Sequence, residues 1–154
     1  MGDHMNRCGF TILELVIVVI IVGVVAAIAM PRLSAAGVNA KYNAAHQGFR
    51  SITAALDMYQ NDYRAYPPNA PIATLPPEMT DYLYVSAFTN PPPIGRAWDW
   101  NGEGSGIQSH GINLSIHTVA AEDRTEMERR FDDGDPDTGI YRKQNHYLVW
   151  PMGF

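Results

Sequence analysis

Cysteines, basic runs and catalytic motifs are scarce in this chain. The 154 residues include one cysteine, Cys8, so no intramolecular disulfide can form. Lysine and arginine number 11 against 16 acidic residues and form no run, which argues against nucleic acid as a partner. The glycines match neither a P-loop nor a dinucleotide fingerprint. With no catalytic constellation present, the sequence predicts that the protein is not an enzyme.

Histidines and tryptophans offer little chemistry of their own. The four histidines beyond His4 have no paired zinc spacing and no cysteine partners, so we expect them at or near the surface: His46, His110, His117 and His146. Trp98, Trp100 and Trp150 are expected in the core or at subunit contacts. No resident cofactor is predicted.

The chain does have one long hydrophobic run. Between Phe10 and Met30 the only polar side chains are Thr11 and Glu14, and Pro31 follows. As a helix rising 1.5 Å per residue, this run is about 30 Å long, the thickness of a bilayer's hydrocarbon core. In lipid only a helix satisfies all backbone groups within one segment. The run therefore predicts a single membrane-spanning helix.

Glu14 is the unusual residue of this run. A carboxylate near the bilayer centre costs about 2.5–3.5 kcal/mol on insertion scales, and somewhat less nearer the end of the helix. Its neighbours on the same helix are apolar. We therefore expect its partner on another chain, or at a terminal amine.

The segment Gly9-Phe10-Thr11-Ile12-Leu13-Glu14 resembles the processing site of type IV prepilins and type II secretion pseudopilins. In that family a dedicated peptidase cuts after the glycine and methylates the new N-terminus. The resemblance implies cleavage between Gly9 and Phe10 and N-methylation of Phe10. It further implies that Glu14 meets the N-terminal amine of a neighbouring subunit during assembly, and that Gly23 and Pro31 are helix-weakening positions.

The same resemblance implies the organisation and location of the chain. Residues 1–9 would be a leader peptide, 10–30 a transmembrane and filament-core helix, and 31–154 a periplasmic globular domain. The precursor would cross the bacterial inner membrane once. After contact with an inner-membrane assembly platform, the subunits would form a periplasmic or extracellular filament with themselves and other pilins.

A second apolar pattern continues beyond Pro31. Apolar residues recur at spacings of three and four, which predicts one amphipathic helix as far as about Asp62. The stripe comprises Val38, Tyr42, Ala45, Phe49, Ile52, Leu56, Tyr59 and Tyr63. Pro67 and Pro68 stop the helix. The segment 56–67 resembles the end of the long helix in major pseudopilins.

The C-terminal half predicts a small antiparallel sheet beside the helix. Residues 67–93 are proline-rich and read as an ordered loop with a helical turn near 77–83. Strands are expected at 97–101, 112–117, 140–142 and 147–150, and a helix at 120–131. Alternation of Ile112, Leu114 and Ile116 with polar residues predicts a half-buried strand. The expected fold is α+β and pilin-like.

An acidic turn is the candidate metal site. Asp133, Asp135 and Asp137 at alternate positions can direct oxygens to one point, as calcium loops do. The EF-hand pattern is not met, because no glycine directly follows the third acid and no bidentate glutamate lies downstream. The alternative is a solvated turn whose aspartates accept backbone hydrogen bonds.

Taken together, these features predict a structural subunit of a type IV pilus (fimbrium) or of a type II secretion pseudopilus. One alternative is a membrane-anchored periplasmic binding module that does not polymerise, using the tryptophans and the glycine-rich segment 102–111. Two other interpretations of the N-terminus are a signal peptide cut near Ala27-Ile28-Ala29 and an uncleaved anchor.

Overall fold

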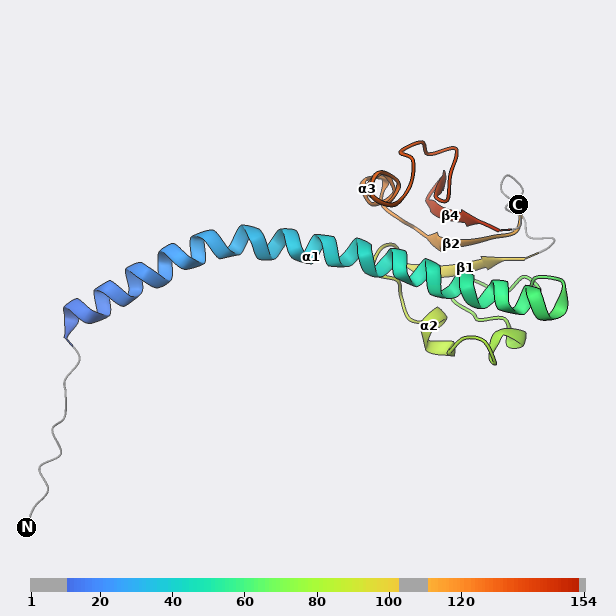
Figure 1. Ribbon diagram of the computed structural model, residues 1–154, viewed down its shortest axis with the longest axis horizontal. Helices are drawn as coiled ribbons and strands as arrows, with labels where there is room; N and C mark the ends of the chain where they lie inside the picture. Colours follow the sequence, from blue (N-terminus) through green and yellow to red (C-terminus); the bar gives the residue numbers. More distant parts are fainter. Residues whose placement is uncertain (1–10, 103–110, 153–154) are drawn as a thin grey trace, which may run out of the picture. The chain divides into compact units, whose positions relative to one another are not determined.

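The computed structural model describes residues 11–102 and 111–152. It divides into two compact units, Met1–Asn39 and Ala40–Phe154, which we describe separately. Helix α1 (Ile12–Tyr63) contributes to both (Figure 1). The predicted helix is confirmed, and it continues through Pro31.

Helix α1 ends one residue beyond the predicted position. Arg64, immediately after it, has a φ of 59°, and its N–H donates to the carbonyl of Gln60 at 2.8 Å. A residue in the left-handed region caps the last helical turn. The chain then reaches Pro67, whose carbonyl accepts a hydrogen bond from Nε1 of Trp100 at 3.1 Å. This bond is one of those that order the start of the proline-rich loop.

Four antiparallel strands form one sheet in the order β1-β2-β4-β3. Strand β1 (Ala97–Asn101) pairs with β2 (Asn113–His117), and β4 (Tyr147–Pro151) lies between β2 and β3 (Arg142–Gln144). The prediction for β3 was wrong by about two residues. The backbone N–H of Tyr141 donates to the Asp132 carboxylate instead of joining the ladder. The β3–β4 turn consists of Asn145, with a φ of 48°, and His146.

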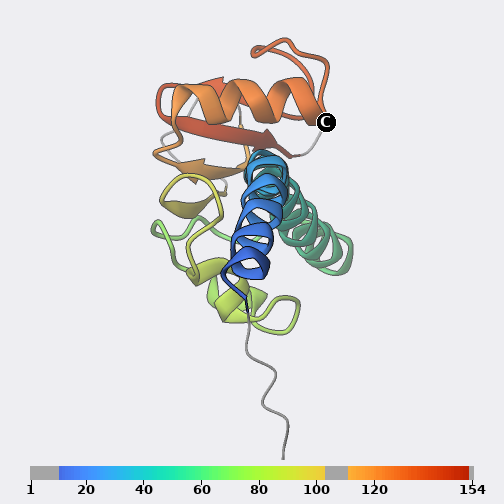
Figure 2. The same ribbon diagram turned by 90° about the vertical axis from the view of Figure 1, so that its left-hand side faces the viewer.

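Short helices complete the globular unit. Helix α3 (Ala121–Phe131) confirms the predicted helix to within one residue. In the proline-rich loop, a 3₁₀ turn (Pro77–Met79) confirms the expected helical turn, and helix α2 (Val85–Thr89) was not predicted. Figure 2 shows α3 on one side of the sheet region and α2 on the other.

The hydrophobic core lies between one face of the sheet and the outer half of α1. Phe49 is fully buried, with ring centroids 5.1 Å from Trp98 and 5.7 Å from Trp150. The predicted stripe is buried in its middle and exposed at Val38 and Tyr63. Buried core residues of this layer are Tyr42, Ala45, Ile52, Leu56, Trp100, Leu114, Ile116 and Leu148.

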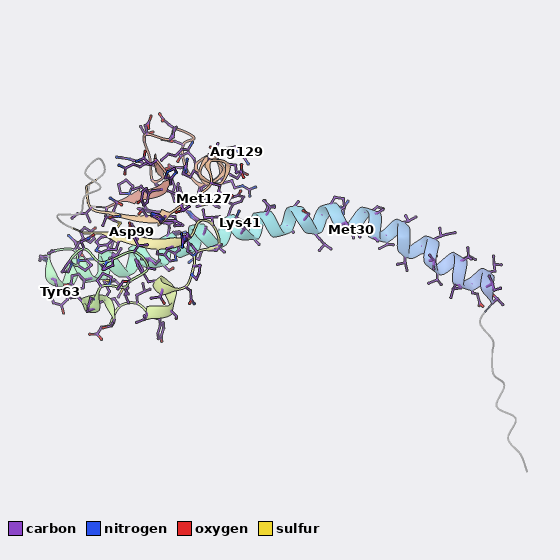
Figure 3. All side chains as sticks on the ribbon, turned by 180° about the vertical axis from the view of Figure 1, so that it is seen from behind. Met30, Lys41, Tyr63, Asp99, Met127 and Arg129 are labelled. Carbon is purple, nitrogen blue, oxygen red and sulfur yellow. The ribbon has the colours of Figure 1, made fainter. Side chains whose placement is uncertain are left out.

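The opposite face of the sheet is polar and also buried. The prediction of a half-buried β2 was therefore wrong, since Asn113 and Ser115 are both 0% exposed. The register places these residues beside β1, where Nδ2 of Asn101 donates to Oδ1 of Asn113 at 3.1 Å and to Oγ of Ser115 at 3.2 Å. Asp99, labelled in Figure 3, joins this network, and burial raises the pKa of its carboxyl group. Cross-strand hydrogen bonds thus make burial of these polar side chains tolerable.

Candidate functional site

The N-terminal half of α1 is an exposed apolar rod. Large side chains from Ile12 (84% exposed) to Met30 (69%) lie open, and this helix is long and apolar enough to cross a membrane. Figure 3 shows the side chains around Met30 projecting from the helix. An apolar surface of this size marks a site that lipid or other protein covers.

Glu14 has a partner on its own helix, contrary to the sequence-based expectation. Its Oε2 accepts hydrogen bonds from the backbone N–H and the hydroxyl of Thr11, both at 2.9 Å. The Glu14 N–H in turn donates to Oγ1 of Thr11 at 3.2 Å. This reciprocal arrangement is a capping box at the start of α1. The signal was present in the sequence as a threonine three residues before a glutamate.

The predicted helix-weakening residues have different surroundings. A Cβ added at Gly23 would meet no atom within 4 Å, so no packing contact requires glycine there. Pro31 lies inside α1 and removes one backbone donor from the helical ladder. The predicted cleavage and methylation residues, Gly9 and Phe10, lie outside the described residues.

The acidic turn forms internal hydrogen bonds. Oδ1 of Asp133 accepts the N–H of Asp135 at 2.9 Å, and Oδ1 of Asp135 accepts the N–H of Asp137 at 3.0 Å. Oδ2 of Asp133 accepts the hydroxyl of Thr138 at 2.9 Å. These aspartates therefore turn the backbone in the way the solvated-turn interpretation describes. Calcium binding at Asp133, Asp135 and Asp137 stays a prediction.

A different group of carboxylates comes together beside this turn. Glu128, Asp132 and Asp133 each offer an oxygen, and these oxygens lie within 4.8 Å of one another. Glu128 is 1% exposed, and neither of its oxygens has a hydrogen-bond partner within residues 11–102 and 111–152. Burial, followed by the charges of Asp132 and Asp133, raises its pKa to about 7. Helix periodicity alone does not show that α3 turns Glu128 inward, next to the buried Met127.

The aromatic residues serve the core. Trp98 and Trp100 are buried, and His46 stacks on Phe131 with ring centroids 4.3 Å apart. Nδ1 of His46 lies 2.9 Å from the hydroxyl of Tyr141, and burial together with Arg50 lowers the pKa of this imidazole. His110 lies outside the described residues, while His117 and His146 are at least partly exposed.

Helix α3 is attached to α1 by polar contacts at one end of the globular unit. Asp123 accepts hydrogen bonds from Nζ of Lys41 at 2.8 Å and from the hydroxyl of Tyr42 at 2.7 Å. The guanidinium of Arg130 lies over the Tyr42 ring, 4.9 Å from its centroid. Glu126 pairs with Arg129 and Arg130 along α3. These charged side chains therefore hold α3 in place against α1.

Comparisons with known proteins match part of the chain. Residues 4–30 match the family model described as the prokaryotic N-terminal methylation motif. The type II secretion system core protein G of Pseudomonas aeruginosa is 42% identical over 62 residues, 40% of this chain and 44% of the relative. The protein of the same name from Pectobacterium carotovorum subsp. carotovorum is 39% identical over 59 residues, 38% of each chain.

The chain spans less than half the length of these curated relatives, and no solved structure matches it significantly. The similarity is nevertheless consistent with the fold, in which a long N-terminal helix precedes a small antiparallel sheet. Through its methylation motif and these relatives, and with its exposed apolar helix, the chain is similar to type IV pilins and type II secretion pseudopilins.

Proposed function

We propose that this protein is a structural subunit of a type IV pilus or a type II secretion pseudopilus, held in the filament by the apolar half of α1. The observation that carries the proposal is the exposure of nearly every large side chain between Ile12 and Met30. Such a segment needs an apolar environment at every stage. Lipid supplies it before assembly, and copies of the same helix supply it afterwards.

The steps before assembly follow from the N-terminal motif. A prepilin peptidase removes residues 1–9 and methylates Phe10, while the globular unit stands on the periplasmic side of the inner membrane. An assembly platform in that membrane then transfers the subunit into the growing filament. These steps are supported by the match of residues 4–30 to the methylation motif.

Glu14 has two roles in this proposal. In the isolated subunit its carboxylate accepts two hydrogen bonds from Thr11, which lowers the cost of placing it at the membrane boundary. During assembly the carboxylate meets the Phe10 amine of a neighbour. That ion pair forms in a low dielectric and requires the negative charge, whereas the capping box requires only an acceptor.

The two roles can be separated by substitution. Glu14→Gln keeps an acceptor for the capping box and removes the charge, while Glu14→Ala removes both. We expect both variants to insert into the membrane and both to lose filaments, as measured by shearing, sedimentation and immunoblotting. Filaments of normal yield from Glu14→Gln would contradict the ion-pair role. Thr11→Ala is the matched control, since it weakens the cap and keeps the charge.

Mass spectrometry of the mature N-terminus tests the proposal as a whole. Methylated Phe10 is expected in cells that contain the peptidase. A chain beginning at Met30 would indicate a secreted protein, and an intact leader that still carries Cys8 would indicate a simple anchor. A processed chain that never forms filaments would favour the membrane-anchored binding module.

A further inference from the structure

A basic pocket lies at the β1 edge of the sheet. This cavity of about 450 Å³, here called the Arg96 pocket, is lined by Arg96, His117 and Thr89 together with apolar side chains, including Ile72 and Pro91. Among the described residues that line it none is acidic, although the chain as a whole carries a net charge of −5. A concave site of this size with a few convergent polar groups is suited to binding.

The backbone around the Arg96 pocket brings the two basic residues together. The N–H of Arg96 donates to the carbonyl of His117 at 2.8 Å. Gly95, with a φ of 70°, permits this approach, because a Cβ there would lie 2.9 Å from the His117 carbonyl oxygen.

A strained residue orients the imidazole. Thr118 is β-branched and adopts a φ of 56°, and its hydroxyl hydrogen-bonds Nδ1 of His117. Nε2 is thereby the ring nitrogen left for a ligand. Left-handed backbone at a non-glycine residue tends to occur at functional sites. The arrangement is suited to a carboxylate.

Exposed carboxylates lie at the other edge of the sheet. Asp133, Asp135 and Asp137 are exposed in the turn between α3 and β3. Hydrogen bonds within the turn hold Asp133 and Asp135. Within the described residues, none of the hydrogen bonds has the Asp137 carboxylate as acceptor, so it is available to a partner.

The two features cannot meet within one molecule. Strands β1 and β3 form opposite edges of the four-stranded sheet, about 14 Å apart at the usual strand spacing. Thr89, the last residue of α2, lines the Arg96 pocket. Figures 1 and 2 show α2 on the opposite side of the globular unit from the turn that follows α3. A contact between them must join two copies. Because it uses different surfaces on each copy, it leaves a free surface at both ends and can propagate.

We propose that the acidic turn of one copy docks at the Arg96 pocket of the next, with Asp137 facing Arg96 and His117. This contact rests on the proposed filament function and adds a lateral link between globular units. The opposite charges of the two surfaces also favour this arrangement of neighbouring copies over one that brings two acidic turns together.

Cysteine cross-linking of assembled filaments tests the contact directly. In a Cys8→Ser background, the Arg96→Cys/Asp137→Cys variant should form a ladder of disulfide-linked multimers on oxidation. Either single cysteine variant should give dimers at most, because one cysteine per copy cannot extend a chain. Filaments of normal yield that give no ladder would overturn the docking inference and leave the proposed function intact. Absence of filaments from the unmodified chain would overturn the proposed function itself.

Charge reversal gives an independent readout. Arg96→Glu and Asp137→Arg should each lower the yield of sedimented filaments by about tenfold, since like charges then face each other, and the double variant should recover most of the yield. Arg64→Glu and Asp81→Arg are matched controls at exposed positions outside the two surfaces. Circular dichroism confirms that each variant folds. Folded single variants with unchanged yield, or a double variant no better than either, would refute the contact.

Discussion

At Gly48 the helix α1 packs closely against Trp98 of the sheet, and Gly48→Ala therefore tests the packing of the two layers. A Cβ at this position would lie 2.7 Å from Cζ2 and 3.0 Å from Cη2 of Trp98. Trp98 is 3% exposed, and its ring stands edge-on to Phe49. Because the indole is enclosed, it cannot move away without disturbing the core.

Two effects of opposite sign determine the size of the change. Overpacking a filled core costs about 1–3 kcal/mol. Replacing glycine with alanine inside a helix gains about 1 kcal/mol. The difference predicts a net loss of about 1 kcal/mol in the free energy of unfolding, which lowers the melting temperature of a domain this size by about 4 °C.

Urea unfolding of a soluble fragment, residues 31–154, provides the measurement. Gly37→Ala is the matched control, since a Cβ there meets nothing within 4 Å and should not destabilise the fragment. In a Trp98→Phe background the clash is relieved, so Gly48→Ala should become neutral or stabilising. A gain of about 1 kcal/mol from Gly48→Ala in the unmodified fragment, as at an open helix position, would refute this account of the interface.

Three further outcomes are expected from the globular unit. Burial raises the pKa of Glu128 from 4.5 to about 7, so its contribution to stability is complete below pH 4.5 and is lost as the pH rises through 7. Between pH 5 and pH 8 the free energy of unfolding of Glu128→Gln should therefore rise by about 1–3 kcal/mol relative to that of the unmodified fragment, as measured by urea unfolding. Parallel profiles of unfolding free energy against pH for the two proteins would contradict this. If the acidic turn binds calcium, millimolar calcium should raise the melting temperature of the fragment. Loss of this rise in Glu128→Gln or in Asp137→Asn would identify that residue as a ligand. No rise in the unmodified fragment would support the solvated-turn interpretation. Asn101→Ala should cost about 1–3 kcal/mol, because Asn113 and Ser115 lose their buried donor, and a change below about 0.5 kcal/mol would count against the network.

Local signals were sufficient for the long helix and for most strands. A 21-residue run that is almost wholly apolar specifies a helix in lipid whatever its neighbours are. Pro67 and Pro68 limit how far the helix can continue, and it ends at Tyr63. Strand β1 was predicted with its observed bounds, because Trp98 and Trp100 alternate with polar residues. Strand β3 was misplaced, because the side chain of Asp132, nine residues before Tyr141, captures the backbone N–H that would have extended the ladder.

The candidate sites likewise differ in whether local sequence alone could identify them. The Gly9-Phe10 junction and Glu14 were recognisable as a contiguous motif, whereas the capping box at Thr11 was overlooked although it is equally local. Glu128 could not have been identified without the fold, since its burial depends on the way α3 packs. The Arg96 pocket combines residues from four separate segments, so no spacing within the sequence indicates it.

The sequence by itself thus determined that this chain has an apolar N-terminal helix that must be kept out of water. The reason is that the hydrophobicity of a segment and its helical hydrogen bonding depend on that segment alone. Tertiary structure alone decided which polar groups are buried and which carboxylates meet. Those outcomes depend on strand register and on helix packing between residues far apart in the chain, and register is set by the whole sheet.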